Sequence, residues 1–104
     1  MMIDLVQLRT FVAVAEEQHL TRAAERIHIS LSSASAHIRG VEDALGTQLF
    51  VRTKRSLVLT RAGELLFKRA KALLNEAALL QSFSMELRGQ IGRASCRERV
   101  SSPV

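Results

Sequence analysis

The sequence has 104 residues, and 47% of them are hydrophobic, a composition that suits one small domain with a packed core. The sequence contains no apolar run long enough to cross a membrane. Fifteen Lys and Arg against ten Asp and Glu give a formal net charge of +5, which favours an anionic partner such as a nucleic acid or an acidic lipid surface. Four Phe are the only aromatic side chains, so stacking surfaces for single strands or RNA have little to be built from, and duplex DNA is favoured.

Two helices are predicted in the first quarter of the chain. Asp4 followed three positions later by Gln7 matches a capping box, and apolar residues then recur at helical spacing over residues 5–18. Thr21 is expected to cap a second, short helix over residues 22–27. Small alanines in that second helix allow another helix to cross it closely.

A third helix is predicted from Ser30, as N-cap, to Gly46, whose lack of a side chain suits the left-handed residue that ends a helix. Apolar residues recur along it at steps of three and four, which indicates one buried stripe. The stripe consists of Leu31, Ala34, Ile38, Val41 and Leu45.

Residues 49–60 combine β-forming side chains with a basic tip at 52–56, which predicts a small two-stranded wing. Thr60 is expected to cap a long helix over residues 61–88, with no proline to interrupt it. Along this helix a seam with steps of four and three matches the heptad pattern of a helix that pairs with another. The seam consists of Leu66, Ala70, Leu73, Ala77, Leu80, Ser84 and Leu87.

The predicted layout is a DNA-binding domain at residues 1–60, a dimerisation helix at 61–91 and a tail at 92–104. The tail contains the only cysteine and the only proline of the chain and shows no periodicity. It is interpreted as a non-native or disordered segment.

A helix that enters the major groove needs one packed side and, on the other side, small or polar groups near its N-terminus. The third helix has that pattern, and acidic residues appear only at its far end. The wing tip adds cations for the DNA backbone or minor groove. The predicted DNA-contacting residues are Thr21, Ser30, Leu31, Ser32, Ser33, Ser35, Ala36, His37 and Arg39, with Arg52, Thr53, Lys54 and Arg55 from the wing.

The residue patterns predict no catalytic site, metal site or cofactor. The histidines do not follow metal-ligand spacings and are interpreted as surface or turn residues: His19, His28 and His37. The serine-rich stretch has no Gly-x-Ser-x-Gly elbow, so a nucleophile is not indicated. Cys96 is interpreted as an inert free thiol, and a lone cysteine indicates the cytoplasm. The chain is not predicted to be an enzyme.

Three segments resemble the N-terminal domain of LysR-type transcriptional regulators, over about residues 3–91. They are LxxFVAVAEEQHLTRAAERIHIS from Leu8, IRxVEDALGTQLFVR from Ile38 and LTRAGELL from Leu59. The resemblance implies a winged helix-turn-helix with its motif at residues 20–39 and a linker helix that pairs two subunits. It also implies an effector-sensing domain, which this chain is not expected to contain.

The sequence departs from the family pattern where DNA is expected to be read. The usual Gln-Pro is Leu31-Ser32, and the usual Ser-Arg is Ser35-Ala36. These changes remove base-edge donors and leave the operator sequence open.

The predicted fold class is therefore mainly α, a winged helix-turn-helix with a small wing and a long C-terminal dimerisation helix. The predicted function is sequence-specific binding of double-stranded DNA as a homodimeric transcriptional regulator at the cytoplasmic nucleoid, without a membrane partner or a small-molecule effector site. The basic stretch from residue 52 to 61 favours this function. The alternative is a truncated interaction module that pairs with full-length regulators without binding DNA specifically, which the altered residues on the third helix favour.

Overall fold

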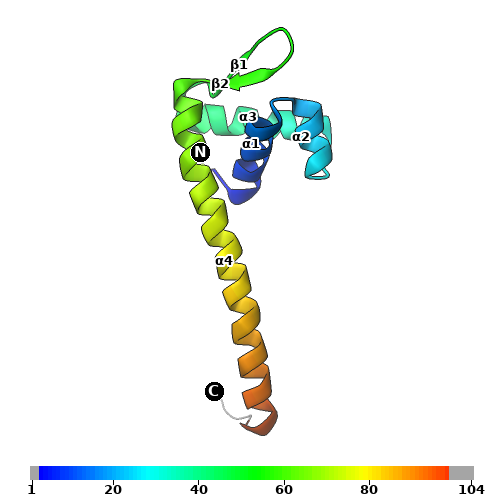
Figure 1. The fold of residues 1–104 in the computed structure, drawn as a ribbon, viewed down its shortest axis with the longest axis vertical. Helices are drawn as coiled ribbons and strands as arrows, with labels where there is room; N and C mark the ends of the chain where they lie inside the picture. The colour runs from blue at the N-terminus through cyan, green and yellow to red at the C-terminus, as the bar shows by residue number, and fades with distance from the viewer. Residues whose placement is uncertain (1–2, 99–104) are drawn as a thin grey trace. The chain divides into compact units, whose positions relative to one another are not determined.

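The computed structural model describes the backbone of residues 3–98 and the side chains of residues 3–89. The order of its elements is α1 (Leu5–Glu17), α2 (Leu20–Arg26), α3 (Leu31–Leu45), β1 (Phe50–Arg52), β2 (Leu57–Leu59) and α4 (Arg61–Glu98) (Figure 1). The chain divides into two units, residues 1–74 and residues 75–104, so α4 begins in the first and ends in the second. The predicted fold class is confirmed, a mainly helical chain with a two-stranded wing.

The N-terminus of α1 is held by the predicted capping box. The Asp4 carboxylate accepts a hydrogen bond from the Gln7 amide at 2.8 Å, and the Gln7 side chain accepts one from the Asp4 amide at 3.1 Å. Two amides that the helix itself leaves unpaired are thus satisfied by local side chains. The helix ends at Gln18, which takes the left-handed conformation with φ of 57°.

The second helix begins two residues earlier than predicted, and its cap is His19 rather than Thr21. The backbone of His19 is extended, and its Nδ1 accepts a hydrogen bond from the Arg22 amide at 3.3 Å. Because His19 already occupies the capping position, Thr21 lies inside the first turn. The prediction of Thr21 as N-cap was therefore wrong.

Both ends of α3 are as predicted, with Ser30 accepting from the Ser33 amide at 3.0 Å and Gly46 left-handed at φ 69°. The buried stripe is shorter than predicted. Its centre is packed, but Leu31 and Leu45 are 49% and 46% exposed. These two residues stand at opposite ends of the helix.

The core of the first unit is built around α1. Phe11 and Val14 are fully buried, and Val41 of α3 and Leu49 before β1 close over them. The Phe11 and Phe50 rings pack at a tilt, with centroids 5.4 Å apart, a favourable arrangement for aromatic pairs. This core joins α3 and the first strand in one unit.

The wing is an antiparallel hairpin in which Val51 pairs with Val58. Its tip is closed by Thr53, whose amide and hydroxyl both donate to the Ser56 carbonyl at 2.8 and 2.9 Å. At the tip end of β2, the Leu57 amide donates to the Gln18 carbonyl at 3.0 Å, which attaches the wing to the turn between α1 and α2.

Thr60 caps α4 as predicted, by accepting from the Gly63 amide at 3.0 Å. The helix was predicted to end near residue 88 but continues to Glu98, because Gly89 remains in helical conformation and a glycine inside a helix costs only about 1 kcal/mol. Residues 92–98 of the predicted tail therefore belong to α4, and residues 99–104 lie outside the described part. Among the described residues, no helix is long and apolar enough to span a membrane.

The predicted heptad seam does not keep one role along α4. Ala70 is only 1% exposed and belongs to the core of the first unit, and Leu66 packs against that core. The assignment of Ala70 to dimerisation was wrong, because the core of its own unit already buries this side chain.

Candidate nucleic-acid interface

The outward face of α3 carries short polar, apolar and basic side chains. The exposed residues of its first two and a half turns are Leu31, Ser32, Ser33, Ala36 and Arg39. No acidic residue interrupts this stretch, so a polyanion meets no repelling charge there. The free amides of the helix N-terminus add a partial positive charge at the same end.

Three serines form a hydrogen-bonded cluster at the start of α3. The Ser30 hydroxyl donates to Ser33 Oγ at 2.9 Å and lies 3.3 Å from Ser32 Oγ. Since Ser30 has one hydroxyl hydrogen and gives it to Ser33, Ser32 is the donor in the second contact. Ser33 therefore keeps a free hydrogen to donate outward, whereas Ser32 offers only lone pairs.

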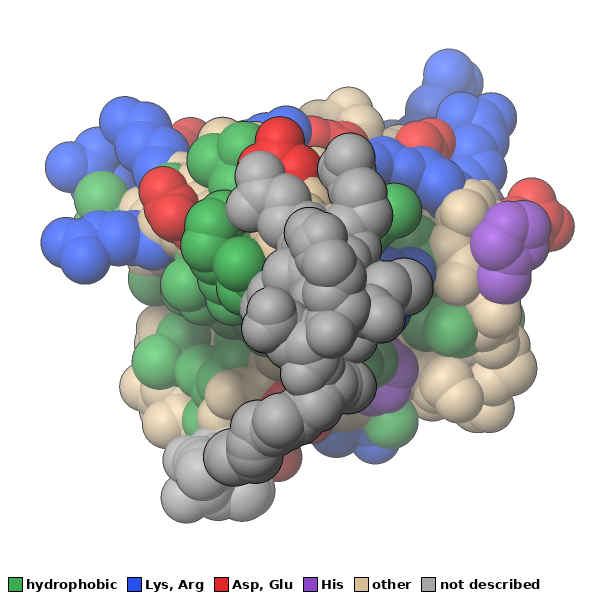
Figure 2. Space-filling model, turned by 90° about the horizontal axis from the view of Figure 1, so that it is seen from below, with side chains coloured by type: hydrophobic (Ala, Val, Ile, Leu, Met, Phe, Trp, Pro, Cys, Tyr) green, Lys and Arg blue, Asp and Glu red, His purple; other side chains and the backbone are tan. Residues whose placement is uncertain are grey.

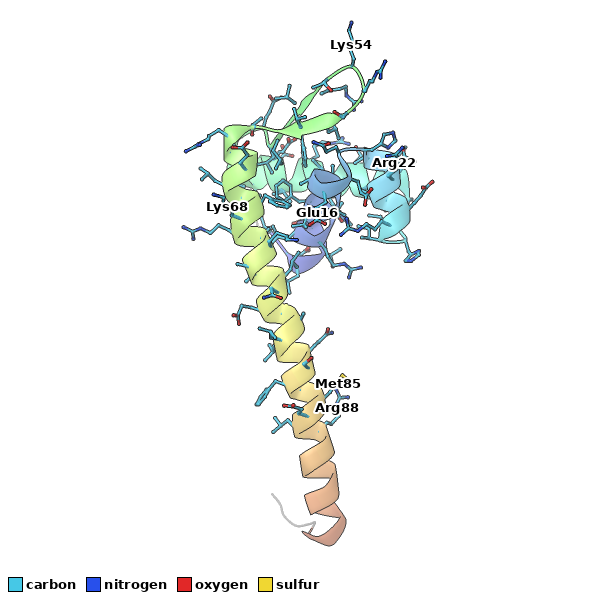
Figure 3. All side chains as sticks on the ribbon, in the orientation of Figure 1. Glu16, Arg22, Lys54, Lys68, Met85 and Arg88 are labelled. Carbon is cyan, nitrogen blue, oxygen red and sulfur yellow. The ribbon has the colours of Figure 1, made fainter. Side chains whose placement is uncertain are left out.

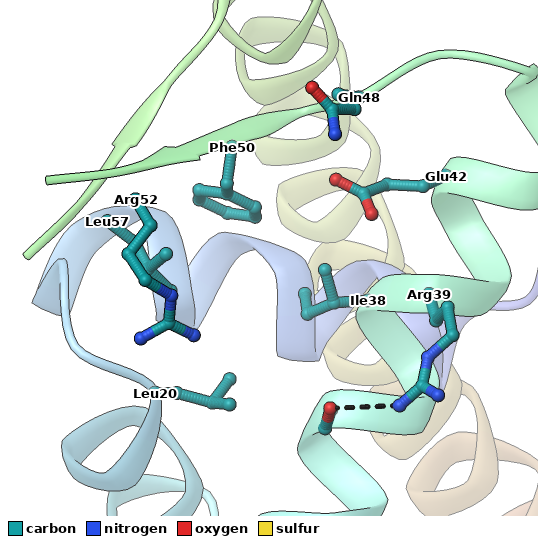
Figure 4. Close-up of a pocket in the computed structure, with 9 residues that line it drawn as sticks. Leu20, Ile38, Arg39, Glu42, Gln48, Phe50, Arg52 and Leu57 are labelled. Atoms are coloured by element: carbon teal, nitrogen blue, oxygen red, sulfur yellow. Dashed lines mark hydrogen bonds between the residues drawn. The ribbon is translucent and has the colours of Figure 1, made fainter.

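Ser35 was predicted to stand opposite the buried stripe, but it is half-buried on the flank of α3 that faces the wing. Its Oγ accepts a hydrogen bond from Arg39 Nη2 at 3.1 Å. Both residues line a groove of about 350 Å³ between α3 and the hairpin, with Arg52 on the opposite wall (Figure 4). The Glu42 carboxylate in this groove accepts from the Leu49 amide at 2.9 Å and so ties α3 to β1.

His37 was predicted to read DNA, but it lies on the other flank of α3, toward α1. It is half-buried, and its Nδ1 is 2.8 Å from the hydroxyl of the buried Thr10. The geometry assigns this side chain to packing between two helices, and its placement opposite the stripe was wrong. Sequence reasoning also missed Thr10, because a contact between residues 27 positions apart leaves no local pattern.

The cations of the wing are exposed. Lys54 stands at the tip of the hairpin and points away from the helices (Figure 3). Arg52 and Arg55 line a second groove, of about 280 Å³, whose other wall includes Thr21 and Leu31. The fold thus brings the wing, the start of α2 and the start of α3 to one place.

The acidic residues of α1 are engaged away from this surface. Glu16 accepts hydrogen bonds from Arg26 of α2 and Lys71 of α4, both at 2.7 Å, and Glu17 is paired with Arg26 at 3.3 Å. The hydrogen bond from Lys71, followed by that from Arg26, lowers the pKa of Glu16 below its ordinary value. The same contact with Glu16 raises the pKa of Arg26.

In the second unit the predicted seam residues Leu80 and Leu87 are exposed, as is Leu73 at the end of the first. Further large apolar side chains outside the predicted seam are exposed on the same helix: Leu79, Phe83 and Met85. Figure 2 shows hydrophobic side chains, in green, at the surface of the face in view.

Within the described residues, no group of three potential metal-ligating side chains gathers in one place.

Comparison with known proteins identifies relatives of the chain. The model of "Bacterial regulatory helix-turn-helix protein, lysR family" matches residues 5–64. The HTH-type transcriptional regulator XapR of Escherichia coli (strain K12) is 47% identical over 91 residues, which are 86% of this chain and 31% of XapR. The chain thus spans about a third of the length of this curated relative.

Two similar solved structures are DNA complexes. The BenM DNA-binding domain with benA site 1 DNA is 34% identical, with a TM-score of 0.75, and the match covers 81% of this chain and 98% of that domain. The CbnR DNA-binding domain with DNA is 31% identical, with a TM-score of 0.69, and the match covers 90% of this chain and 99% of that domain. The chain belongs to the lysR family of bacterial regulatory helix-turn-helix proteins.

Proposed function

We propose that this chain binds double-stranded DNA of specific sequence, as the DNA-binding part of a transcriptional regulator that acts at the nucleoid. The observation that carries the proposal is the similarity to the BenM and CbnR domains, both solved with DNA and both matched over nearly their whole length. This role requires no catalytic residue and no cofactor.

The arrangement of α3 and the wing supports this function. The start of α3 is exposed and free of acidic residues, which suits insertion into the major groove. The tip with Lys54 and Arg55 lies beside it and can hold the phosphate backbone. In this proposal Ser32, Ser33 and Ala36 face the bases, and His37 positions the helix.

We propose further that the chain acts as a homodimer through α4. Leu80 and Leu87 are exposed in the second unit, and Leu73 is exposed at the end of the first. Two symmetric subunits then place their α3 helices in the major grooves of two half-sites, one or more helical turns apart. Ala70 has no part in this interface, since the core of its own unit buries it, whereas the partly buried Leu66 packs against that core.

The decisive test is selection from a random duplex library, followed by titration of the enriched duplex at several salt concentrations. With about five to seven phosphates contacted by each subunit, the logarithm of affinity should fall with the logarithm of salt at a slope of about −9 or steeper. A pool without an enriched motif and a nearly salt-independent titration would refute the proposal. In that case pairing with full-length regulators becomes the better explanation of the exposed apolar residues.

A further inference from the structure

We propose that Leu31 selects thymine in the operator through the C5-methyl group of that base. The inference rests on the proposed function and names one contact that would determine specificity. It starts from an apolar side chain in the first turn of α3 that its own subunit leaves 49% exposed.

The position of Leu31 distinguishes it from other exposed leucines. It lines the groove that also contains Thr21 and the wing cations Arg52 and Arg55. Cations that hold the phosphates on one side of this groove bring the neighbouring base edges toward the start of α3. Leu45 is exposed to nearly the same extent, but it lies at the opposite end of the helix, on the side of Gly46.

The polar side chains near Leu31 have little capacity to identify a base. Ser30, Ser32 and Ser33 are short and share hydrogen bonds with one another. A bidentate contact with guanine or adenine needs Arg, Lys, Asn or Gln, and none of these occurs in residues 30–38. Arg39 comes two turns later and donates to Ser35.

The discriminating contact available to the first turn is therefore apolar. In the major groove, thymine is the base that presents a methyl group, and a leucine side chain that covers it removes both from water. Burial of one methyl-sized group corresponds to about a fourfold change in affinity. A symmetric dimer doubles the free-energy change, which gives about 15-fold when both half-sites are altered.

The test uses the duplex enriched by selection, with each thymine replaced in turn by uracil, which lacks only the C5-methyl group. For the wild-type chain, we expect one symmetric pair of replacements to weaken binding by about 15-fold. Cytosine at that position should also bind weakly, and 5-methylcytosine should recover part of the loss because it restores the methyl group.

Two variants test whether Leu31 causes the discrimination between thymine and uracil, and a third is designed to change the preferred base. In Leu31→Ala, thymine and uracil should bind within about 1.5-fold of each other, because the covering side chain is gone. In Leu45→Ala, a matched truncation of a leucine with similar exposure, the discrimination should remain at its wild-type level. Leu31→Gln should move the preference toward adenine, which offers glutamine a bidentate pair. Both positions are exposed, so unfolding midpoints should stay close to that of the wild type.

The outcomes separate this inference from the proposed function. Equal affinity of the wild-type chain for every thymine and uracil duplex would overturn the inference while leaving specific DNA binding intact. Discrimination that persists in Leu31→Ala would overturn the role of Leu31. Selection without any enriched motif would overturn the proposed function and this inference with it.

Discussion

The Nδ1 nitrogen of His37 in α3 lies 2.8 Å from the Thr10 hydroxyl in α1. That hydroxyl also donates to the Val6 carbonyl at 3.1 Å, so its single hydrogen is used and His37 supplies the hydrogen between the two side chains. Thr10 is only 1% exposed. The hydrogen bond therefore joins α3, the helix predicted to enter the major groove, to the buried Thr10 of α1. This contact helps to fix the position of α3 in its unit.

Thr10→Val should remove the acceptor for His37 with little change in shape. The free energy of unfolding should fall by about 1 kcal/mol, or more if the imidazole stays unpaired. Urea denaturation measures this loss, and Thr47→Val, at an exposed threonine, serves as the control. The motif that the variant selects from a duplex library should be unchanged. A changed motif would mean that His37 contributes to base recognition.

Glu16→Gln tests the ionic contacts that join α1 to α2 and α4. Because the pKa of Glu16 is lowered in the folded state, its charge stabilises the fold at neutral pH, and this stabilisation is lost as the pH falls through the lowered pKa. At pH 7 the variant should be less stable by about 1 kcal/mol, a modest value because these side chains are partly exposed.

Below the ordinary carboxyl range near 4.5, the stabilities of wild type and Glu16→Gln should converge. Denaturation at several pH values gives the comparison, with Glu76→Gln as the control at an exposed carboxylate. If the difference between wild type and Glu16→Gln instead grew toward acidic pH, the Glu16 charge would not be stabilising the fold.

Gly63→Ala should destabilise the first unit strongly. A Cβ atom at this position would lie 2.2 Å from the Leu49 carbonyl oxygen, which also accepts from the Thr60 amide at 2.9 Å. Overpacking of this kind costs about 1–3 kcal/mol, and here the obstacle is backbone. Gly89→Ala is the matched control, since a Cβ there meets nothing within 4 Å. It should be neutral or stabilise the helix by up to about 1 kcal/mol. Thermal unfolding of both variants distinguishes the two sites.

Arg55→Ala should weaken binding to the selected duplex and to random duplex by similar factors, because a phosphate contact carries no sequence information. The slope of log affinity against log salt should become shallower by about 0.9 for each phosphate that the variant no longer neutralises. Lys68→Ala removes the same charge from the exposed side of α4 and should leave the slope near its wild-type value (Figure 3). Weaker binding confined to the selected duplex would show that Arg55 reads bases.

Leu80→Lys should shift the chain from dimer to monomer at micromolar concentration. Leu80 is 65% exposed, and a charge at the centre of an apolar contact would have to lose its water on pairing. Sedimentation velocity or light scattering gives the mass. Gln81→Lys adds the same charge at the neighbouring exposed position and should leave the dimer intact. A wild-type mass that stays monomeric at every concentration would contradict the proposed dimer.

The sequence by itself determined the features that depend on near neighbours in the chain. Asp4 with Gln7, Ser30, Thr60 and Gly46 were all predicted at the helix ends where they lie, because a cap forms within three or four residues. The wing was also predicted, from β-forming residues on either side of a polar basic tip. Thr21 was wrongly predicted as the N-cap of α2, because His19, a residue not usually considered a cap, occupies the capping position two residues earlier.

Only the tertiary structure decided the contacts between distant segments. Ala70 fits a heptad seam by spacing, yet it is buried in the core of its own unit. The His37 side chain contacts Thr10 of α1 and does not lie on the outward face of α3. Periodicity gives the angle of a residue around its helix but does not say which neighbour occupies that side. That neighbour is set by how the helices and the hairpin fill the core together, which is a property of the whole packed unit.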